Sequence, residues 1–223
     1  MIGTPRVHQR LTDSTNERAK ALADAGALHG TLVTADEQAA GRGRQGREWT
    51  APPGSSVLMS LVLREFDELL PLTAAVAVCQ ALPSEAGLKW PNDVWIDRRK
   101  VAGILVEGRP QEGWAVLGIG LNVTTKEFPP ELAETATSLH LAGIDAGRDQ
   151  VLAELLRSLS EWLGAPPDAV LSAWRSRDAL KGERVRWSGG EGTADGIDDS
   201  GALLVQTSDG PVTLDAGEVH LLR

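Results

Sequence analysis

The sequence predicts an α+β protein in which helices pack on a mixed β-sheet and a small β-barrel follows. Three observations support this fold class. Helix-like and strand-like segments alternate as far as Arg177, whereas only short β-like runs, separated by glycine and aspartate, follow Asp178. The length of 223 residues, with 42% hydrophobic and 24% charged residues, is ordinary for a soluble globular protein with one substantial core. We therefore expect two domains, residues 1–177 and residues 178–223.

The first expected helix spans residues 14–26. Ser14 and Glu17 have the spacing of a capping box, and Gly26 can end the helix. A strand-like run follows at residues 31–35. Further apolar runs predict strands at residues 56–63, 101–107 and 114–123.

Three helices are expected between and after these strands. Residues 70–82 form an apolar helix that Pro83 should end. Residues 149–163 carry an apolar stripe that includes Leu152, Leu155 and Leu159, so they predict an amphipathic helix. The prolines at 166–167 break it, and a short helix should continue to about Arg177.

The C-terminal part reads as a barrel. Short strands are expected at residues 184–187, 193–197, 202–207, 211–214 and 218–222. Strands this short and this close together predict a small barrel of about 45 residues. We expect it to position an acceptor or to help close the active site.

Composition excludes several classes of protein. The formal net charge of -9 argues against general nucleic-acid binding, which depends on neutralising phosphates. No apolar run approaches the roughly 20 residues of a membrane span and no signal-peptide core is present, so we expect a cytoplasmic protein without membrane contact. The single cysteine, Cys79, lies in an apolar run and is expected to be structural. The four histidines have no metal-ligand spacing.

The most informative segment is residues 41–49, Gly-Arg-Gly-Arg-Gln-Gly-Arg-Glu-Trp, which we call the arginine loop. Glycines allow backbone N–H groups to approach a ligand, and arginines offer forked donors to carboxylate or phosphate oxygens. A basic loop in an acidic protein therefore predicts an anion site. The alternative is a flexible, solvated loop.

The glycines of this loop also match the dinucleotide-binding fingerprint Gly-x-Gly-x-x-Gly. That fingerprint requires a strand directly before the first glycine and a helix after the last. Here residues 36–40 separate the expected strand from Gly41, and residues 52–54, Pro-Pro-Gly, lie where the helix should run. The sequence favours an arginine-bearing loop between two strands.

Three further segments carry polar residues beside predicted strands. Residues 91–93, Pro-Asn-Asp, indicate either an ordinary hairpin turn or contacts to phosphate and magnesium. Lys100 begins an apolar strand, where it could extend to solvent or hold two anions together. In residues 118–122, Gly-Ile-Gly-Leu-Asn, the glycines permit close approach of a flat ligand.

Together these segments resemble the biotin–protein ligase family. The matching segments are 13–16 (Asp-Ser-Thr-Asn), 37–49 including the arginine loop, 89–93 (Lys-Trp-Pro-Asn-Asp), 100–107 (Lys-Val-Ala-Gly-Ile-Leu-Val-Glu) and 118–122. The resemblance spans nearly the whole chain, and the arginine loop is its most specific part. It implies a catalytic domain like that of class II aminoacyl-tRNA synthetases, followed by an SH3-like domain.

The resemblance also implies a reaction. Biotin's carboxylate attacks the α-phosphate of ATP, pyrophosphate leaves, and a lysine of a biotin carboxyl carrier protein, from acetyl-CoA carboxylase or a related carboxylase, attacks the resulting biotinyl-5′-adenylate. ATP and Mg²⁺ act as co-substrate and activating ion, biotin is the substrate, and no tightly bound prosthetic group is expected. Because no enzyme nucleophile is needed, catalysis rests on positioning two anions and neutralising their charge.

The site residues follow from the same resemblance. Catalytic roles are implied for Lys100, Arg42 and Arg44. Biotin contacts are implied for Ser14, Thr15, Asn16, Gln38, Arg42, Gly43, Arg44, Lys100, Gly103 and Gly118. Contacts to ATP or the adenylate are implied for Arg44, Arg47, Trp49, Lys89, Asn92, Gly120 and Asn122, and Asp93 is assigned to Mg²⁺ or its water shell. We also expect residues 40–49 to be mobile until an anion binds.

Other functions remain open. Some family members carry an N-terminal DNA-binding domain and repress transcription; because 13 residues precede Ser14, we expect a ligase without repressor activity, as a monomer or weak homodimer. A lipoate or octanoate ligase or transferase of the same superfamily is one alternative, although such transferases use a cysteine nucleophile. A non-catalytic biotin or adenylate sensor is another.

Overall fold

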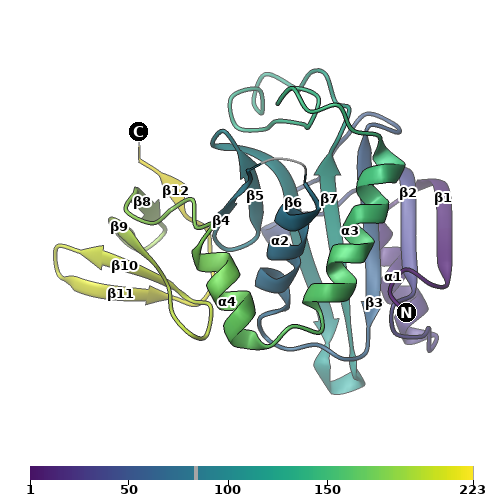
Figure 1. Cartoon of the computed structure of the whole chain (residues 1–223), viewed down its shortest axis with the longest axis horizontal. Coiled ribbons are helices and arrows are strands. Elements are labelled where there is room, and N and C mark those ends of the chain that lie inside the picture. The colour runs from purple at the N-terminus through teal and green to yellow at the C-terminus, as the bar shows by residue number, and fades with distance from the viewer. Residues whose placement is uncertain (83–84, 223) are drawn as a thin grey trace.

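The computed structural model describes residues 1–82 and 85–222, and its centre is a seven-stranded sheet (Figure 1). The strands are β1 (Arg6–Thr12), β2 (Leu32–Gln38), β3 (Ser56–Leu63), β4 (Gly87–Lys89), β5 (Asp93–Ile96), β6 (Arg99–Arg109) and β7 (Trp114–Asn122). Their spatial order is β1-β2-β3-β7-β6-β5-β4. β1 runs parallel to β2 and the other neighbours are antiparallel, which confirms the expected mixed sheet.

Helices cover both faces of this sheet (Figure 1). α1 (Thr15–Asp24) packs on β3 and β7 from one side, while α2 (Leu70–Ala81) and α3 (Arg148–Trp162) pack together on the other, with α4 (Pro167–Arg175) beside α2. Pro83, expected to end the second helix, lies outside the described residues. Within residues 1–82 and 85–222, the structure contains no helix whose length and apolar character would let it cross a bilayer.

The two central strands are buried on both faces. Every residue of β3 is buried, and eight residues of β3 pair with β7 in register, among them Ser60 with Gly118 and Leu58 with Gly120. A strand covered by helices on both sides needs apolar residues at every position. This explains why the apolar runs predicted β3 with its observed bounds and β7 with one residue too many at its end.

A second, five-stranded antiparallel sheet forms the C-terminal part of the chain. It contains β8 (Arg184–Trp187), β9 (Gly190–Ile197), β10 (Leu203–Thr207), β11 (Gly210–Leu214) and β12 (His220–Leu221), which we call the C-terminal sheet. It lies beside the β4–β5 hairpin (Figure 1). From the turn of this hairpin, the buried indole of Trp90 donates a hydrogen bond through Nε1 to Gly201 O, between β9 and β10, at 3.0 Å. This hydrogen bond ties the two sheets together.

Three expectations about the first 40 residues need correction. β1 was not expected, because this edge strand is half exposed and carries polar residues at most positions. β2 continues to Gln38 instead of ending at Ala35, because its polar end still pairs with β1, Leu11 with Glu37 and Thr12 with Gln38. Ser14 is the N-cap residue of α1 but makes no side-chain cap hydrogen bond, so the capping box is wrong, and Glu17 pairs with Lys20 and Arg42 instead.

Candidate active site

One cavity of about 620 Å³ opens over the middle of the large sheet. It is lined by the arginine loop, the start of α1, strands β3, β6 and β7, the β4–β5 hairpin and the end of the C-terminal sheet. All the residues proposed from the sequence lie on its wall: Ser14, Thr15, Asn16, Gln38, Arg42, Gly43, Arg44, Arg47, Trp49, Lys89, Asn92, Asp93, Lys100, Gly103, Gly118, Gly120 and Asn122. The structure brings these residues together, and their individual roles stay predictions.

One end of the cavity is polar and nearly inaccessible to solvent. The backbone N–H and the hydroxyl of Thr15 both donate to Gln38 Oε1, at 2.7 and 3.0 Å. Ser60 Oγ, which is completely buried, lies 2.8 Å from Thr15 Oγ1 and 2.6 Å from Asn16 Oδ1. These mutual hydrogen bonds hold the donors and acceptors at the start of α1 in fixed positions.

Glu107 of β6 stabilises this polar end. Its carboxylate accepts hydrogen bonds from Asn16 Nδ2 at 2.8 Å and from Lys20 Nζ at 2.9 Å. Burial alone would raise the pKa of Glu107, but these two hydrogen bonds and the charges of Lys20 and Arg42 together outweigh it and hold the pKa below its ordinary value. Arg42 also turns toward this group, with Nη1 2.6 Å from Glu17 and 3.7 Å from Glu107.

The two glycines of β7 admit protein side chains. A Cβ atom at Gly118 would overlap Asn16 Oδ1, and one at Gly120 would lie 2.8 Å from Cδ2 of the Trp49 indole. The expected close approach is therefore real, but in this structure the approaching groups are Asn16 and Trp49. The indole Nε1 of Trp49 is buried without a hydrogen-bond partner among the described residues, so it can donate to a ligand.

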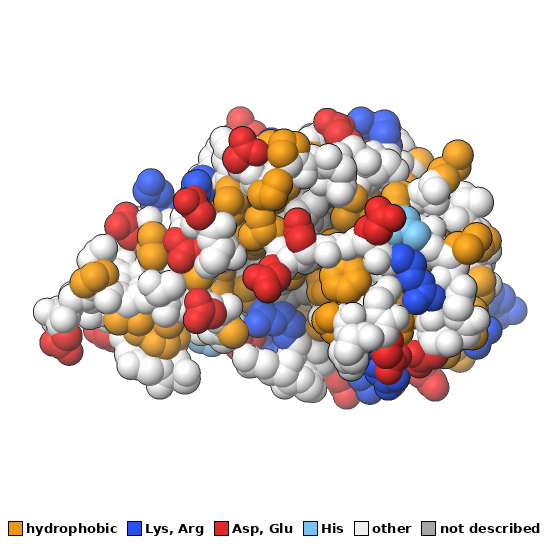
Figure 2. Space-filling model, turned by 90° about the horizontal axis from the view of Figure 1, so that it is seen from below, with side chains coloured by type: hydrophobic (Ala, Val, Ile, Leu, Met, Phe, Trp, Pro, Cys, Tyr) orange, Lys and Arg blue, Asp and Glu red, His pale blue; other side chains and the backbone are white. Residues whose placement is uncertain are grey.

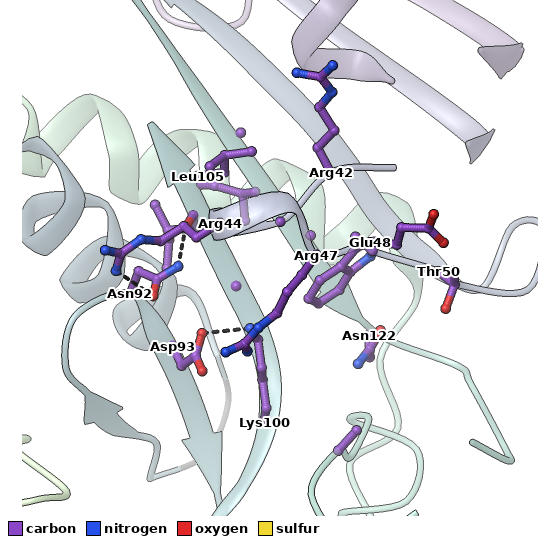
Figure 3. A pocket seen from close by; sticks show the side chains of 18 of the residues that line it. Arg42, Arg44, Arg47, Glu48, Thr50, Asn92, Asp93, Lys100, Leu105 and Asn122 are labelled. Atoms are coloured by element: carbon purple, nitrogen blue, oxygen red, sulfur yellow. Dashed lines mark hydrogen bonds and ion pairs between the residues drawn. The ribbon is translucent and has the colours of Figure 1, made fainter. Parts of the chain in front are cut away.

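Basic side chains gather at the other end of the cavity around Asp93. Lys100 Nζ lies 2.6 Å from Asp93 Oδ1 and Lys89 Nζ 3.9 Å from Asp93 Oδ2, while Arg44 and Arg47 reach the same space from the arginine loop (Figure 3). Burial and then the like charges of this cluster outweigh Asp93 and lower the pKa of Lys89. An excess of positive charge in a partly buried site favours a polyanionic ligand.

Arg42 is the predicted catalytic residue that lies apart from this cluster. In Figure 3 it points away from Asp93 and Lys100, toward α1. The structure therefore brings Arg44 and Lys100 to one end of the cavity and Arg42 to the other.

The two predicted nucleotide-binding asparagines are fixed by backbone contacts. Asn92 Nδ2 donates to Ile104 O at 2.6 Å, and its Oδ1 accepts from Arg44 Nη1 at 3.2 Å (Figure 3). Asn122 Nδ2 donates to Thr137 O at 3.1 Å. The hairpin interpretation of residues 91–93 is confirmed, and the same turn also lines the cavity.

The arginine loop folds into a small closed turn. Gly43 N donates to Arg47 O at 2.8 Å and Trp49 N donates to Gly41 O at 2.9 Å. The only helical feature inside it is the three-residue 3-10 turn Arg44–Gly46, after which the chain reaches β3. A dinucleotide fingerprint needs a helix at this point, so the structure contradicts that alternative and confirms a loop between two strands.

Several lining residues were not found by sequence reasoning. Residues 124–147 received no prediction, yet Thr135 O accepts a hydrogen bond from Lys100 N at 2.8 Å, and Thr137 N donates to Lys100 O at 2.8 Å. Ser60, which contacts the lining residues Thr15 and Asn16, is a serine in the middle of an apolar run, and that pattern could have indicated it. Glu218 and His220 of the C-terminal part also line the cavity, and neither belongs to a sequence motif that would have predicted this.

The residues present do not form a closed metal site. Among residues 1–82 and 85–222 no group of three or more His, Cys, Asp or Glu side chains is placed to hold an ion. Asp93, the predicted magnesium contact, is held 2.6 Å from Lys100 and would have to weaken that ion pair to bind a metal directly. The geometry suits Asp93 as a counter-ion of Lys100 better than as a metal ligand.

Cys79 lies in α2 and does not line the cavity. Burial raises the pKa of its thiol to about 12, so it stays protonated at neutral pH. This confirms the structural interpretation of the cysteine and leaves it unsuited to act as a nucleophile.

Comparison with known proteins agrees with this geometry. Residues 8–123 match the biotin/lipoate A/B protein ligase family, and residues 181–222 match the biotin protein ligase C-terminal domain. The chain is 38% identical to a biotin–[acetyl-CoA-carboxylase] ligase of Mycobacterium tuberculosis, over 95% of this chain and 87% of that protein. It is 35% identical to the bifunctional ligase/repressor BirA of Bacillus subtilis, over 99% of this chain and 75% of that protein.

A solved structure is similar over the whole chain. The biotin protein ligase from Aquifex aeolicus in complex with biotin and ATP superposes with a TM-score of 0.85, at 31% identity, over 99% of both chains. The two family matches together span both sheets of the structure. The resemblance drawn from the motifs is confirmed: the chain belongs to the biotin/lipoate A/B protein ligase family and carries the C-terminal domain of its biotin protein ligases.

Proposed function

We propose that this protein is a biotin–protein ligase that makes biotinyl-5′-adenylate from biotin and ATP and transfers the biotinyl group to a lysine of a carrier protein. One observation carries the proposal: a single cavity joins a fixed hydrogen-bonding end at Thr15 and Asn16 to a cationic end at Lys100. Biotin has a polar ring system at one end and a carboxylate at the other, so it matches this polarity.

The polar end binds the biotin ring. Its donors and acceptors on Thr15, Asn16 and Gln38 are aligned by hydrogen bonds within the protein and so need little reorganisation when biotin enters, and Ser14 lines the same end of the cavity. The walls between the two ends include Met59, Ile104, Leu105 and Ile119, whose apolar surface suits a hydrocarbon chain. This arrangement favours biotin because it combines polar and apolar contacts along one channel.

The cationic end binds the carboxylate and the triphosphate. Lys100 is held by its backbone to Thr135 and Thr137 and by its side chain to Asp93, so its ammonium group has a defined position. There it neutralises the carboxylate as it approaches the α-phosphate, and then the charge that develops in the transition state. Arg44 and Arg47 bind phosphate oxygens, and the indole of Trp49 lies where a nucleotide base can stack.

Magnesium accompanies the nucleotide in this proposal. It prefers phosphate and carboxylate oxygens and keeps several waters, so it does not need a closed protein site. Its chemistry would be to neutralise the departing pyrophosphate. Asp93 stays with Lys100 and takes part through the water shell of the ion.

The acceptor is a biotin carboxyl carrier domain of a carboxylase, in keeping with the name of the mycobacterial relative. We propose that the C-terminal sheet belongs to a separate domain, which helps to position this acceptor. The face shown in Figure 2 carries many acidic side chains, as expected for a net charge of -9, and this argues against a nucleic-acid partner. We propose a cytoplasmic monomer or weak homodimer.

A transferase with a cysteine nucleophile is the alternative within the family. The buried position of Cys79 and its raised pKa disfavour it. A lipoate ligase remains distinguishable only by its substrate. A sensor without turnover would bind the same ligands.

Exchange of labelled pyrophosphate into ATP tests the proposal, with biotin, lipoate, octanoate and no acid compared in the presence of Mg²⁺. Exchange that depends on biotin is the expected result. Exchange that depends on lipoate or octanoate instead would assign the protein to the neighbouring activity. Binding of biotin without exchange would favour the sensor.

A further inference from the structure

An ion pair joins the arginine loop to the C-terminal part of the chain. Arg47 Nη2 pairs with Glu218 Oε2, and Glu218 lies just before β12 on the wall of the active-site cavity. The side chains of Arg47 and Glu218 are 54% and 24% exposed. The carboxylate of Glu218, which lies outside the large sheet, is thus paired with Arg47, the residue that binds phosphate oxygens in the proposed function.

The Glu218 side of this pair is rigidly held. Its neighbour Val219 is completely buried in the main hydrophobic core. His220 pairs with Arg186 across β12 and β8, and Leu222 N donates to Arg184 O at 2.9 Å. The carboxylate therefore has a fixed origin on a packed segment.

The Arg47 side is held only by its backbone. Arg47 O accepts a hydrogen bond from Gly43 N at 2.8 Å, but the side chain is the more exposed member of the pair, so it can leave Glu218 by rotation of its own bonds. Arg47 also lies near Arg44, and its charge is felt by Lys89 and His220. Because these neighbours are mostly cationic, Arg47 gains from an anionic partner, and that partner can be exchanged.

We propose that Glu218 is a placeholder counter-ion for Arg47, which it binds in the nucleotide-free protein, releases to the triphosphate of ATP, and takes back when pyrophosphate leaves. A carboxylate and a polyphosphate compete for one guanidinium group, so the pair weakens the binding of both nucleotide and pyrophosphate. Glu218 is then a positioning residue that keeps the loop near the cavity and assists product release. The inference rests on the proposed function, because it takes ATP and pyrophosphate as the ligands.

The variant Glu218→Gln keeps the size of the side chain and removes its charge. We expect the KM for ATP to fall by about two- to fivefold, which corresponds to roughly 0.4–1 kcal/mol, the usual range for a partly exposed ion pair. Pyrophosphate should inhibit adenylation at a correspondingly lower concentration. Trypsin should cut after Arg47 faster in the ligand-free variant. A purely structural role predicts the opposite, a higher KM for ATP.

Two controls isolate the effect. Glu191→Gln removes another carboxylate of the C-terminal sheet, one that pairs with Arg184 and Arg186 away from the cavity, and should change none of these values. In an Arg47→Gln background, Glu218→Gln should no longer lower the KM for ATP, because there is no cation left to release. An unchanged or raised KM in the single variant Glu218→Gln overturns the inference.

Failure of the proposed function gives a different result. If the wild-type protein exchanges no pyrophosphate with biotin, the ligase proposal is wrong. Protection of the Arg47 bond from trypsin by inorganic pyrophosphate alone then still decides the inference. Glu218→Gln should reach half-protection at a lower pyrophosphate concentration than the wild type, and equal concentrations would refute competition.

Discussion

Replacing Gly118 with alanine tests whether this glycine of β7 is needed to admit Asn16. The added methyl group would overlap Asn16 Oδ1 and lie 2.8 Å from Asn16 Cγ, closer than real Cβ contacts occur. Asn16 is only 4% exposed and has little room to move. Any shift of its amide disturbs the contacts to Ser60 at 2.6 Å and to Glu107 at 2.8 Å.

The expected magnitude follows from these contacts. Overpacking a filled site costs about 1–3 kcal/mol, and leaving a buried polar group unpaired costs about 1–3 kcal/mol more. We expect the free energy of unfolding to fall by roughly 3–4 kcal/mol. For a chain of this size the melting temperature should then fall by about 6–16 °C.

Calorimetry and pyrophosphate exchange measure the two consequences of Gly118→Ala. The melting temperature should fall, and the KM for biotin should rise more than the KM for ATP, because Asn16 lies at the biotin end. Gly164→Ala is the matched control, since its methyl group would meet only Glu161 O at 3.7 Å, an ordinary contact. If Gly118→Ala and Gly164→Ala have the same melting temperature and the KM of Gly118→Ala for biotin equals that of the wild type, the reasoning about Asn16 is wrong.

Three other perturbations address the cationic end, the loop and the polar end. Lys100→Ala should reduce biotin-dependent exchange by at least about 100-fold, the cost of losing one preorganised charge contact, and should weaken biotin binding, measured by calorimetry, by a smaller factor. Trypsin should cut the free protein after Arg42, Arg44 or Arg47, and biotin with ATP should block cleavage. Glu107 has a lowered pKa when folded, so its stabilisation is present above its unfolded pKa near 4.5 and is lost as the pH falls through the folded value. Glu107→Gln should therefore flatten the acid loss of stability seen by denaturant unfolding.

Each of these has a clear contrary result. Unchanged exchange would remove Lys100 from the mechanism. Equal cleavage with and without ligands would show that the loop does not close over them. If the free energy of unfolding of Glu107→Gln falls with acid as steeply as that of the wild type, other carboxylates are responsible for the loss of stability at low pH.

The centre of the fold is predictable from sequence, and its edge is not. β3 and β7 are buried on both faces, so burial alone requires an apolar residue at nearly every position. β1 is a half-exposed edge strand that forms because β2 offers it backbone partners, and its own residues carry little signal. The capping box fails for a related reason, since Glu17 pairs with Lys20 one turn along the same helix and with Arg42 of the arginine loop.

The residues of the candidate site also fall into those that the sequence predicts and those that it does not. Residues that lie within the motifs were identified because each motif contributes one wall of the cavity. Ser60, Thr135 and Glu218 reach the site only through strand pairing, a long loop and the docking of the second sheet. Their positions depend on tertiary packing, and local patterns do not encode that. The glycines of β7 were identified correctly, but which side chains fill the space over them required the structure.

The most direct test of the account separates the two half-reactions. The protein is incubated with biotin, ATP and Mg²⁺, freed of unbound ligand, and then mixed with a purified biotin carboxyl carrier domain, with mass spectrometry at both steps. The account predicts noncovalently held biotinyl-5′-adenylate in the first step and one biotinyl group on one carrier lysine in the second. A covalent adduct on the protein itself, or carrier modification without prior ATP, would contradict it.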